Sequence, residues 1–405
     1  MAELTGHKPT VFAAFLHFDL SFMIWVLLGA LGVSISESLG LQPAQKGLMV
    51  AIPILSGSLM RIPLGLLSDR YGGRRVGIGM LLALFLPLAI GWQSGNSLNT
   101  LLSVGLMLGV AGASFAVVLP LASRWYPPER QGLVMGIAAA GNSGTVVANL
   151  VAPRIAAIVG WHNVLALTMI PLALVLVVFS LMAKDSPNRA APQSVASYLR
   201  VLRVPELWWF CLFYSVTFGG YVGLSSFMPL LLRDQYQVAA VTAGYLTALA
   251  ALAGSALRPV GGYVADRIGG VRLLSVLLGG IAATYLAASR IPGLTGMVVL
   301  LVAAMVCLGL GNGAVFQLVP QCFRRQIGIA TGVVGAVGGV GGFFLPTMLG
   351  QFKQSTGSFQ LGFVALGSVA LVCLVLLRRL MSTHPEWSSS WRRAAVGGTQ
   401  YRRAA

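Results

Sequence analysis

Long apolar stretches alternate with short polar segments along almost the whole chain, from Val11 to Met381. Each stretch is close to the roughly 20 residues that a helix needs to cross the hydrocarbon core of a bilayer. The pattern therefore predicts an all-α membrane protein with twelve transmembrane helices. We expect these spans at residues 11–36, 46–67, 76–93, 100–122, 132–158, 163–183, 207–232, 240–264, 273–290, 297–320, 328–350 and 359–381.

The composition agrees with this pattern. Of 405 residues, 57% are hydrophobic and 9% are charged, whereas a soluble domain has roughly 25% charged residues. The opening Met1-Ala2-Glu3-Leu4 lacks the basic segment and the small-residue cleavage site of a secretory signal. We therefore expect the first apolar run to be retained as a span.

The net charge of +17 raises the question of nucleic-acid binding, but the basic residues lie beside the spans and favour membrane topology instead. If the N-terminus is inside, twenty of them face the cytosol and five face outward, which predicts cytosolic N- and C-termini in the cell inner (plasma) membrane. The cytosolic set is Lys8, Arg70, Arg74, Arg75, Arg124, Arg130, Lys184, Arg189, Arg200, Arg203, Arg267, Arg272, Arg324, Arg325, Arg378, Arg379, Arg392, Arg393, Arg402 and Arg403. The outer set is Lys46, Arg154, Arg233, Arg290 and Lys353.

The sequence offers little enzyme chemistry. The four cysteines, Cys211, Cys307, Cys322 and Cys373, fall in spans or at their ends without close pairing, and we interpret them as small core residues. The four histidines are equally scattered, and no nucleophile–base pair, metal-ligand spacing or phosphate loop is recognisable. We expect no enzyme activity, no metal, no cofactor and no nucleic-acid partner.

An internal repeat defines the organisation of the chain. The motif R-x-x-x-G-x-x-x-D-R-x-G-G-x-R begins at Arg61 and again at Arg258, an offset of 197 residues. Because this offset is about half the chain, it predicts two pseudo-twofold-related six-helix bundles. The expected boundaries are an N-terminal bundle at 1–183, a cytosolic linker at 184–206, a C-terminal bundle at 207–381 and a basic cytosolic tail at 382–405.

The polar end of each repeat resembles the loop signature that recurs in both halves of major facilitator transporters. The resemblance implies a conformational latch on the cytosolic side, formed by Asp69 and Arg70 in the first copy and by Asp266 and Arg267 in the second. The glycines permit a tight turn, and each aspartate can pair with an arginine or cap a helix in one conformation and release it in another.

Arg61 and Arg258 carry the strongest functional signal. Each lies eight residues, about 12 Å of helix, before its loop aspartate and therefore inside the hydrocarbon layer. An unpaired cation at that depth costs about 2.5–3.5 kcal/mol on insertion scales, so such a residue normally faces the interior and has a task. Of the ten acidic residues, Asp19 alone lies well within a span. We expect the two guanidinium groups to face each other and to bind a small planar oxyanion through their rigid forks.

Spans five and eleven are rich in glycine. Span five contains Gly132-x-x-x-Gly136 and then Ala140-Gly141-Asn142-Ser143-Gly144, and span eleven contains Gly338-Gly339-Val340-Gly341-Gly342-Phe343-Phe344-Leu345-Pro346. Most of these glycines are expected to allow close helix packing. The amide of Asn142 can in addition donate to a bound oxyanion. Aromatic residues accompany these spans at Phe115, Phe218 and Tyr221.

These segments, together with the two arginines and Phe218-Gly219-Gly220-Tyr221-Val222-Gly223, resemble the nitrate/nitrite porter family of the major facilitator superfamily. The resemblance covers essentially the whole membrane domain. It implies that Arg61 and Arg258 clamp nitrate or nitrite, that Asn142 contacts the ion beside Gly141, and that aromatics of spans four and seven sandwich it. Phe115 matches the span-four ring, Tyr221 is a further span-seven candidate, and the alignment places Met228 at the second ring of the sandwich.

The family contains proton-coupled nitrate importers and nitrate/nitrite exchangers. Span one, with Phe18-Asp19-Leu20-Ser21-Phe22, is more similar to the importers, which makes Asp19 the proton-coupling candidate. The alternative role of Asp19 is that of a structural partner of span five or of the cytosolic mouth. We expect a monomeric carrier with nitrate, nitrite and protons as its partners.

Three other functions remain open from the residues. A porter of another small anion, such as formate or oxalate, could use the same two arginines. A proton-driven drug antiporter usually has a Gly-Pro element in span five, where Gly141-Asn142 stands here. A membrane sensor would need a soluble output domain, and the segment after Ser382 is short and basic.

Overall fold

The computed structural model describes residues 6–127, 134–135, 137–187, 200–323 and 326–389, and every regular element within them is helical. Of the residues named above, the glycines Gly132 and Gly136, eight of the cytosolic arginines and most of the linker and tail lie outside this part. The first half contains α1 (Lys8–Trp25), α2 (Leu27–Ala30), α3 (Gly32–Leu39), α4 (Pro43–Tyr71), α5 (Gly73–Ser94), α6 (Leu98–Gly112), α7 (Ser114–Ser123), η1 (Ala140–Ser143), α9 (Gly144–Val159) and α10 (Trp161–Met182). The second contains α12 (Pro205–Tyr214), η2 (Ser215–Gly219), α13 (Gly220–Tyr236), α14 (Ala240–Ile268), α15 (Gly270–Ala288), α16 (Leu294–Cys322), α17 (Ile327–Thr356), α18 (Gln360–Thr383) and α19 (Pro385–Ser389).

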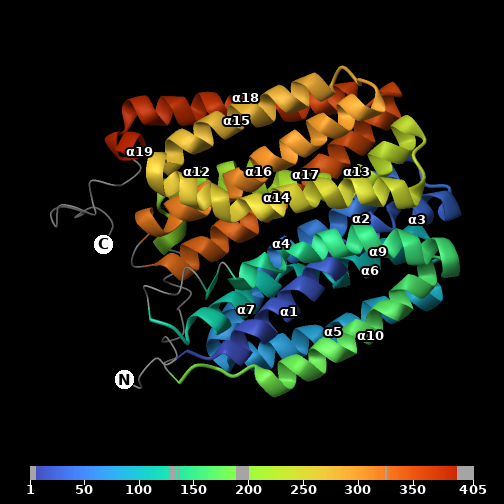
Figure 1. The fold of residues 1–405 in the computed structure, drawn as a ribbon, viewed down its shortest axis with the longest axis horizontal. Helices are drawn as coiled ribbons and strands as arrows, with labels where there is room; N and C mark the ends of the chain where they lie inside the picture. The colour runs from blue at the N-terminus through green and yellow to red at the C-terminus, as the bar shows by residue number, and fades with distance from the viewer. Residues whose placement is uncertain (1–5, 128–133, 136, 188–199, 324–325, 390–405) are drawn as a thin grey trace.

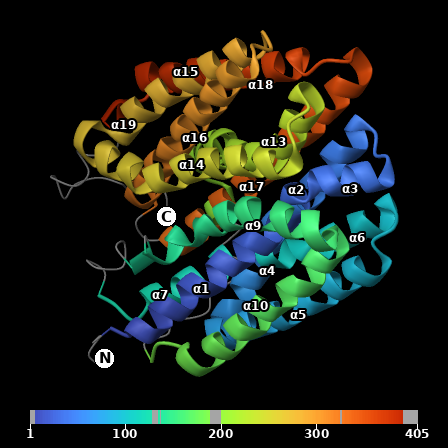
Figure 2. The ribbon, with the colours of Figure 1, turned by 45° about the vertical axis from the view of Figure 1, so that its right-hand side comes forward.

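The two halves form two groups of roughly parallel helices that lie side by side (Figure 1). The start of α1 and the helix α19 lie at the same end of the molecule, and α2, α3 and the end of α13 lie at the opposite end (Figures 1 and 2). The halves meet mainly where α4 packs against α17 and where α9 packs against α14. We call the end with the start of α1 and with α19 the terminal end and the other the far end.

The first predicted span is a segmented helix. Within the described residues, eleven helical segments are long and apolar enough to cross a membrane, and the segment Lys8–Leu39 is not among them because it is divided into α1, α2 and α3. Backbone hydrogen bonds of the α-helical i→i−4 type still cross both breaks, from Ala30 N to Val26 O and from Ile35 N to Leu31 O. This segment corresponds to the first predicted span and, with the eleven others, completes the predicted set of twelve. The predicted fold class is therefore confirmed.

The repeat has a physical counterpart at the ends of α4 and α14. Each helix ends at a glycine with positive φ, Gly72 at 96° and Gly269 at 101°, a conformation that side chains with a Cβ rarely adopt. The next glycine, Gly73 or Gly270, packs against Leu121 or Leu318. All three pairs are separated by 197 residues, so the motif builds the same turn in both halves.

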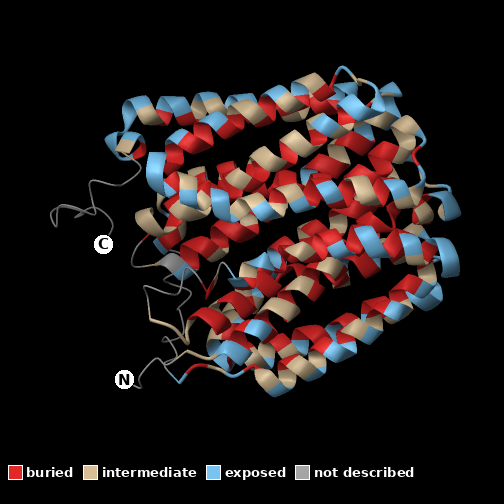
Figure 3. Cartoon of the chain, viewed as in Figure 1, coloured by how far each residue is buried: buried red, intermediate tan, exposed pale blue. Residues whose placement is uncertain are grey.

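The surface carries many exposed apolar side chains, as a protein surrounded by lipid requires. Ile158 and Leu181 are 83% and 75% exposed, although both belong to helices that cross the molecule. Buried residues line the inner faces of the helices in both groups (Figure 3). The chain therefore has its packed core inside each helix group and an apolar exterior.

Close contacts hold the halves together at the far end. Lys46 of α4 pairs with Asp234 of α13 at 2.7 Å, and Arg233 of α13 pairs with Glu37 of α3 at 2.7 Å. Between them, α4 approaches α17 so closely that a Cβ on Gly47 would collide with the carbonyl oxygen of Pro346. The far end is therefore closed by ion pairs and by backbone packing.

Candidate anion-binding site

Arg61 of α4 is 2% exposed and is held by backbone carbonyl groups of both halves. Its Nε donates to Gly112 O at 3.1 Å, and its Nη1 donates to Gly335 O of α17. Its Nη2 is buried and has no hydrogen-bond partner among the described residues. A buried donor in this condition is costly, so Arg61 retains a free charged N–H group for a ligand.

A break in the fourth span supplies one of these carbonyl groups. The α-helical pattern is interrupted at Ala113 between α6 and α7, and Ala116 N donates to Ala113 O at 3.0 Å. The carbonyl of Gly112 thus loses its normal i+4 donor and accepts from Arg61 instead. Such irregular backbone is tolerated inside a membrane protein where the protein itself satisfies the freed groups.

Aromatic faces surround the Arg61 guanidinium. Its carbon lies 4.9 Å from the ring centre of Phe218, 5.4 Å from that of Trp25 and 5.6 Å from that of Phe115. Phe218 belongs to η2, a single turn of π-helix in the seventh span, and π-helical turns are frequent at functional sites. The three rings stabilise a cation while leaving its edge available for hydrogen bonds.

Arg258 of α14 is partly buried and lies against a second aromatic pair. Its Nη2 donates to the hydroxyl oxygen of Tyr214 at 3.3 Å, and its guanidinium carbon lies 5.3 Å from the ring centre of Phe316. Sequence reasoning missed both aromatics. The available signal for Tyr214 was that it is a polar aromatic residue in an apolar span, four positions before Phe218. No sequence signal distinguished Phe316.

Four rings connect the surroundings of the two arginines. Tyr214 stacks on Phe218 at 4.9 Å with an interplanar angle of 2°, and Phe115 meets Phe316 edge to face at 5.8 Å. Tyr214 also packs against Phe316 at 4.8 Å. The structure therefore brings Arg61, Arg258 and Phe115 into one cluster.

The cluster is cationic. Among the described residues, no ion pair joins Arg61 or Arg258 to a carboxylate. Aromatic faces and backbone carbonyl groups take the place of acidic partners. Such a site favours an anion that can accept several hydrogen bonds.

Asn142 lies in η1, a short 3-10 turn in the fifth span. It is 4% exposed, and its Oδ1 has no hydrogen-bond partner. The amide oxygen and nitrogen are interchangeable by rotation, so either can face a ligand. Gly141 packs against α1, since a Cβ there would lie 2.9 Å from Cδ1 of Phe18, and α14 packs against the same turn.

The structure differs from two expectations for the seventh span. The second ring at Arg61 is Phe218, and Met228 lies ten residues further along, so the alignment that placed Met228 there was wrong. The hydroxyl of Tyr221 donates to Ala251 O at 3.3 Å and hydrogen-bonds Ser255. Within the described residues, Tyr221 makes no hydrogen bond or ring contact with either arginine, and Tyr214 makes the contact instead.

Asp19 of α1 accepts a hydrogen bond from Ser143 Oγ at 2.5 Å. Ser143 is the neighbour of Asn142 in η1, so the acidic residue of the first span is linked to the fifth span. This contact corresponds to the structural role that the sequence left open for Asp19. The geometry connects Asp19 to the site through Asn142.

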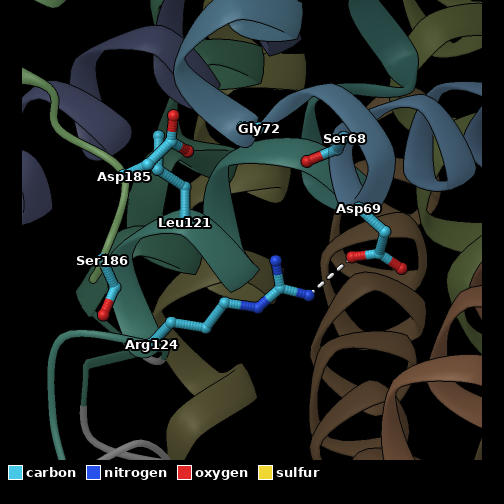
Figure 4. A pocket seen from close by; sticks show the side chains of 8 residues that line it. Ser68, Asp69, Gly72, Leu121, Arg124, Asp185 and Ser186 are labelled. Carbon is cyan, nitrogen blue, oxygen red and sulfur yellow. Dashed lines mark hydrogen bonds and ion pairs between the residues drawn. The ribbon is translucent and has the colours of Figure 1, made fainter. Parts of the chain in front are cut away.

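In the first copy of the motif, the aspartate forms an ion pair at the terminal end. Asp69 pairs with Arg124 at 2.6 Å, beside a small hollow of about 10 Å³ that Asp185 and Ser186 of the linker also line (Figure 4). A hollow of this size holds one water molecule at most. Asp69 therefore ties the ends of the second and fourth spans together.

In the second copy of the motif, the aspartate contacts a glutamine of the tenth span. Asp266 accepts from Gln317 Nε2 at 2.9 Å. The arginines of both loops lie over tyrosine rings, Arg70 over Tyr71 at 5.5 Å and Arg267 over Tyr263 at 4.3 Å. Among the described residues, the two copies of the motif thus share the same turn and an arginine that lies over a tyrosine ring.

Comparison with known proteins identifies the family. Residues 12–346 match the family model of the Major Facilitator Superfamily. The chain is 38% identical over 377 residues to a "Nitrite extrusion protein" of Bacillus subtilis, with 91% of this chain and 94% of the relative covered. It is 36% identical to a "Probable nitrate/nitrite transporter NarK2" of Mycobacterium tuberculosis (87% and 91% covered) and 33% identical to a "Probable nitrate/nitrite antiporter NarK1" of Thermus thermophilus (92% of each).

Solved structures support the fold. The crystal structure of a bacterial homolog of the human lysosomal transporter Spinster superposes with a TM-score of 0.66 at 18% identity, covering 95% of this chain and 96% of that one. The human organic anion transporter MFSD10 superposes with a TM-score of 0.70 at 16% identity, covering 91% and 99%. The chain is therefore a multi-pass membrane transporter of the major facilitator superfamily and belongs, within it, to the nitrate/nitrite porter family.

Proposed function

We propose that this protein is a monomeric secondary transporter that carries nitrate, and also nitrite, between its two helix bundles by alternating access. The observation that carries the proposal is a pair of arginines, Arg61 buried and Arg258 partly buried, for which the described residues supply no carboxylate partner, and of which Arg61 has a free Nη2. The names of its relatives point to the same two anions. The bundles at 1–183 and 207–381 are proposed to move as bodies joined by the linker at 184–206.

The chemistry of the site favours a small flat ion. A guanidinium presents planar, parallel N–H groups that match the oxygens of nitrate. Phe115 and Phe218 flank Arg61, and Gly335 leaves space next to its Nη1, where a Cβ would lie 3.5 Å from that atom. In the proposed complex, Arg61 and Arg258 hold the anion, Asn142 donates to it, and Tyr214 fixes Arg258.

The excess of basic residues in the loops on the same side of the membrane as the two termini supports a cytosolic position of both termini. The far end is then the outer face, and the ion pairs of Lys46 and Arg233 close it. In this orientation the outer side of the carrier is closed. Opening toward the outside would separate these pairs.

We further propose that nitrate uptake is coupled to protons. Inward movement of an anion against the membrane potential costs about 2.3 kcal/mol per charge per 100 mV, so a compensating cation is needed. Asp19 supports this role because it is half-buried in the first span and contacts the turn that bears Asn142. Nitrate/nitrite exchange is the second candidate, since one relative is named an antiporter and another an extrusion protein.

Reconstitution into proteoliposomes tests these proposals. Labelled nitrate is measured in counterflow against nitrate, nitrite, formate or oxalate inside, and in uptake driven by an imposed pH gradient. We expect nitrate and nitrite to drive counterflow and formate and oxalate to fail. Asp19→Asn should lose pH-driven accumulation and keep exchange; absence of pH-driven accumulation in the wild type would make the protein an exchanger.

A further inference from the structure

We propose that Asp19 is also a positioning residue, whose carboxylate holds the 3-10 turn η1 through Ser143 in the register that presents Asn142 to the anion. The inference rests on the nitrate-binding function proposed above. It assigns to Asp19 a task that requires a hydrogen-bond acceptor and no proton transfer.

The turn is docked directly onto α1 at Asp19. A Cβ on Gly141 would lie 2.7 Å from Asp19 N, and a Cβ on Gly144 would collide with Asp19 O. These two glycines bracket Asn142 and Ser143. Since no side chain fits between the two backbones, the position of α1 near residue 19 determines where the turn lies.

The hydrogen bond from Ser143 Oγ to Asp19 Oδ1 fixes the turn along α1. A 3-10 turn has poorer internal hydrogen bonds than an α-helix, so an external anchor has a larger effect on its geometry. Asn142 Oδ1 has no hydrogen-bond partner, although the residue is 4% exposed. The direction of its amide therefore depends on the backbone of the turn.

The same turn touches the surroundings of both arginines. Gly141 packs against Phe18, whose ring lies 6.0 Å from that of Phe115, and Phe115 lies over Arg61. On its other side, η1 packs against α14, the helix of Arg258. A shift of the turn would move Asn142 relative to both guanidinium groups.

A positioning role and a proton-transfer role make different demands on residue 19. Asparagine at this position keeps an acceptor oxygen for Ser143 but cannot take up and release a proton as a carboxyl group does. Alanine removes both. Ser143→Ala removes the hydrogen bond and leaves the carboxylate of Asp19 in place.

The test measures the Kd for nitrate by calorimetry on the purified full-length protein. We expect Asp19→Ala and Ser143→Ala each to weaken binding roughly five- to tenfold, the scale of one lost hydrogen bond. Asp19→Asn should restore the affinity to within about threefold of wild type, and the Asp19→Ala/Ser143→Ala double variant should be no weaker than the weaker single one. Adding Asp19→Ala to Asn142→Ala should have no further effect.

Ser36→Ala is the matched control, since Ser36 is a buried serine of the first span whose hydroxyl donates to Val33 O of its own helix. Ser143→Ala should in addition retain pH-driven accumulation in proteoliposomes. Wild-type affinity in Ser143→Ala, additive losses in the double variant, or equal losses in Asp19→Asn and Asp19→Ala would each overturn the inference alone. Absence of nitrate binding by the wild type would overturn the proposed function and this inference with it.

Discussion

The Lys46–Asp234 ion pair should control how often the far end opens. Lys46 Nζ donates to both carboxylate oxygens of Asp234, at 2.7 and 2.9 Å, and the two side chains are 14% and 16% exposed. The pair joins α4 of one half to α13 of the other. Asp234→Asn removes the charge attraction and keeps the shape of the side chain.

The exposure of the pair sets the expected magnitude. Exposed pairs contribute about 0–1 kcal/mol, and breaking a fully buried pair costs about 3–5 kcal/mol. For this mostly buried pair we expect about 1–2 kcal/mol, which corresponds to a roughly 5- to 30-fold larger open population. Glu37→Gln should have a smaller effect, because Glu37 is 52% exposed in its pair with Arg233.

A single cysteine can report the opening. Ile54→Cys, introduced after replacement of the four native cysteines, places a thiol that is buried where α4 meets α17, since Ile54 is 1% exposed and lies against Gly342. Labelling by a membrane-impermeant maleimide from the outer face should accelerate in Asp234→Asn. The exchange of Lys46→Asp with Asp234→Lys should restore slow labelling. Unchanged labelling in Asp234→Asn, or a larger effect of Glu37→Gln, would refute the reasoning.

Four further predictions concern the site, the latch and the start of α1. Arg61→Lys and Arg258→Lys should each weaken nitrate binding by roughly tenfold or more, because a single ammonium cannot replace the fork; near-normal affinity would contradict the clamp. Tyr214→Phe keeps the ring stack and loses the contact with Arg258, so calorimetry should show a loss of roughly three- to tenfold. Asp69→Asn should slow turnover several-fold in counterflow while the Kd stays within about twofold, since it breaks the contact with Arg124 far from the anion. Burial and neighbouring Lys184 lower the pKa of His7 below its usual 6.5; neutral His7 caps α1 at Thr10 N, so this contribution to stability is present above about pH 6.5 and is lost as the pH falls. Hydrogen exchange of the first turn of α1 should accelerate at about pH 5 relative to pH 8, and His7→Asn should remove that difference.

The fold was predictable because membrane insertion imposes a simple rule on sequence. An apolar stretch of the right length must become a helix, and the repeated glycines at 72 and 269 mark where two of these helices end. The rule does not show how far a helix continues into water. The span expected at 46–67 is α4, Pro43–Tyr71, whose 29 residues measure about 43 Å. Nor does it show breaks such as those at Val26 and Leu31, which depend on packing.

The candidate site was predictable where charge was the signal. Two arginines at matched depth are conspicuous in a chain with few charges, and the structure brings them to one aromatic cluster. The partners of these arginines were less accessible. The π-helical turn η2 changes the helical register after Tyr214, so the facing of Phe218 and Tyr221 could not be obtained by counting along a regular helix. Phe316 has no sequence signal that separates it from core residues.

The hydrogen bond from Arg61 to Gly335 O has a kinetic consequence, because it joins one bundle to the other. If the bundles separate at this level, the empty carrier must break that bond and leave a charged donor unpaired in a dry interior. A bound anion can accept the hydrogen bond from Arg61 in place of Gly335 O, so the loaded carrier avoids this loss. Each 1.4 kcal/mol difference between the two barriers corresponds to about a tenfold difference in rate. The protein should therefore show trans-acceleration: labelled anion should cross faster when unlabelled anion is present on the opposite side. The size of that acceleration would report how much the hydrogen bond from Arg61 to Gly335 O contributes to the barrier of the empty carrier.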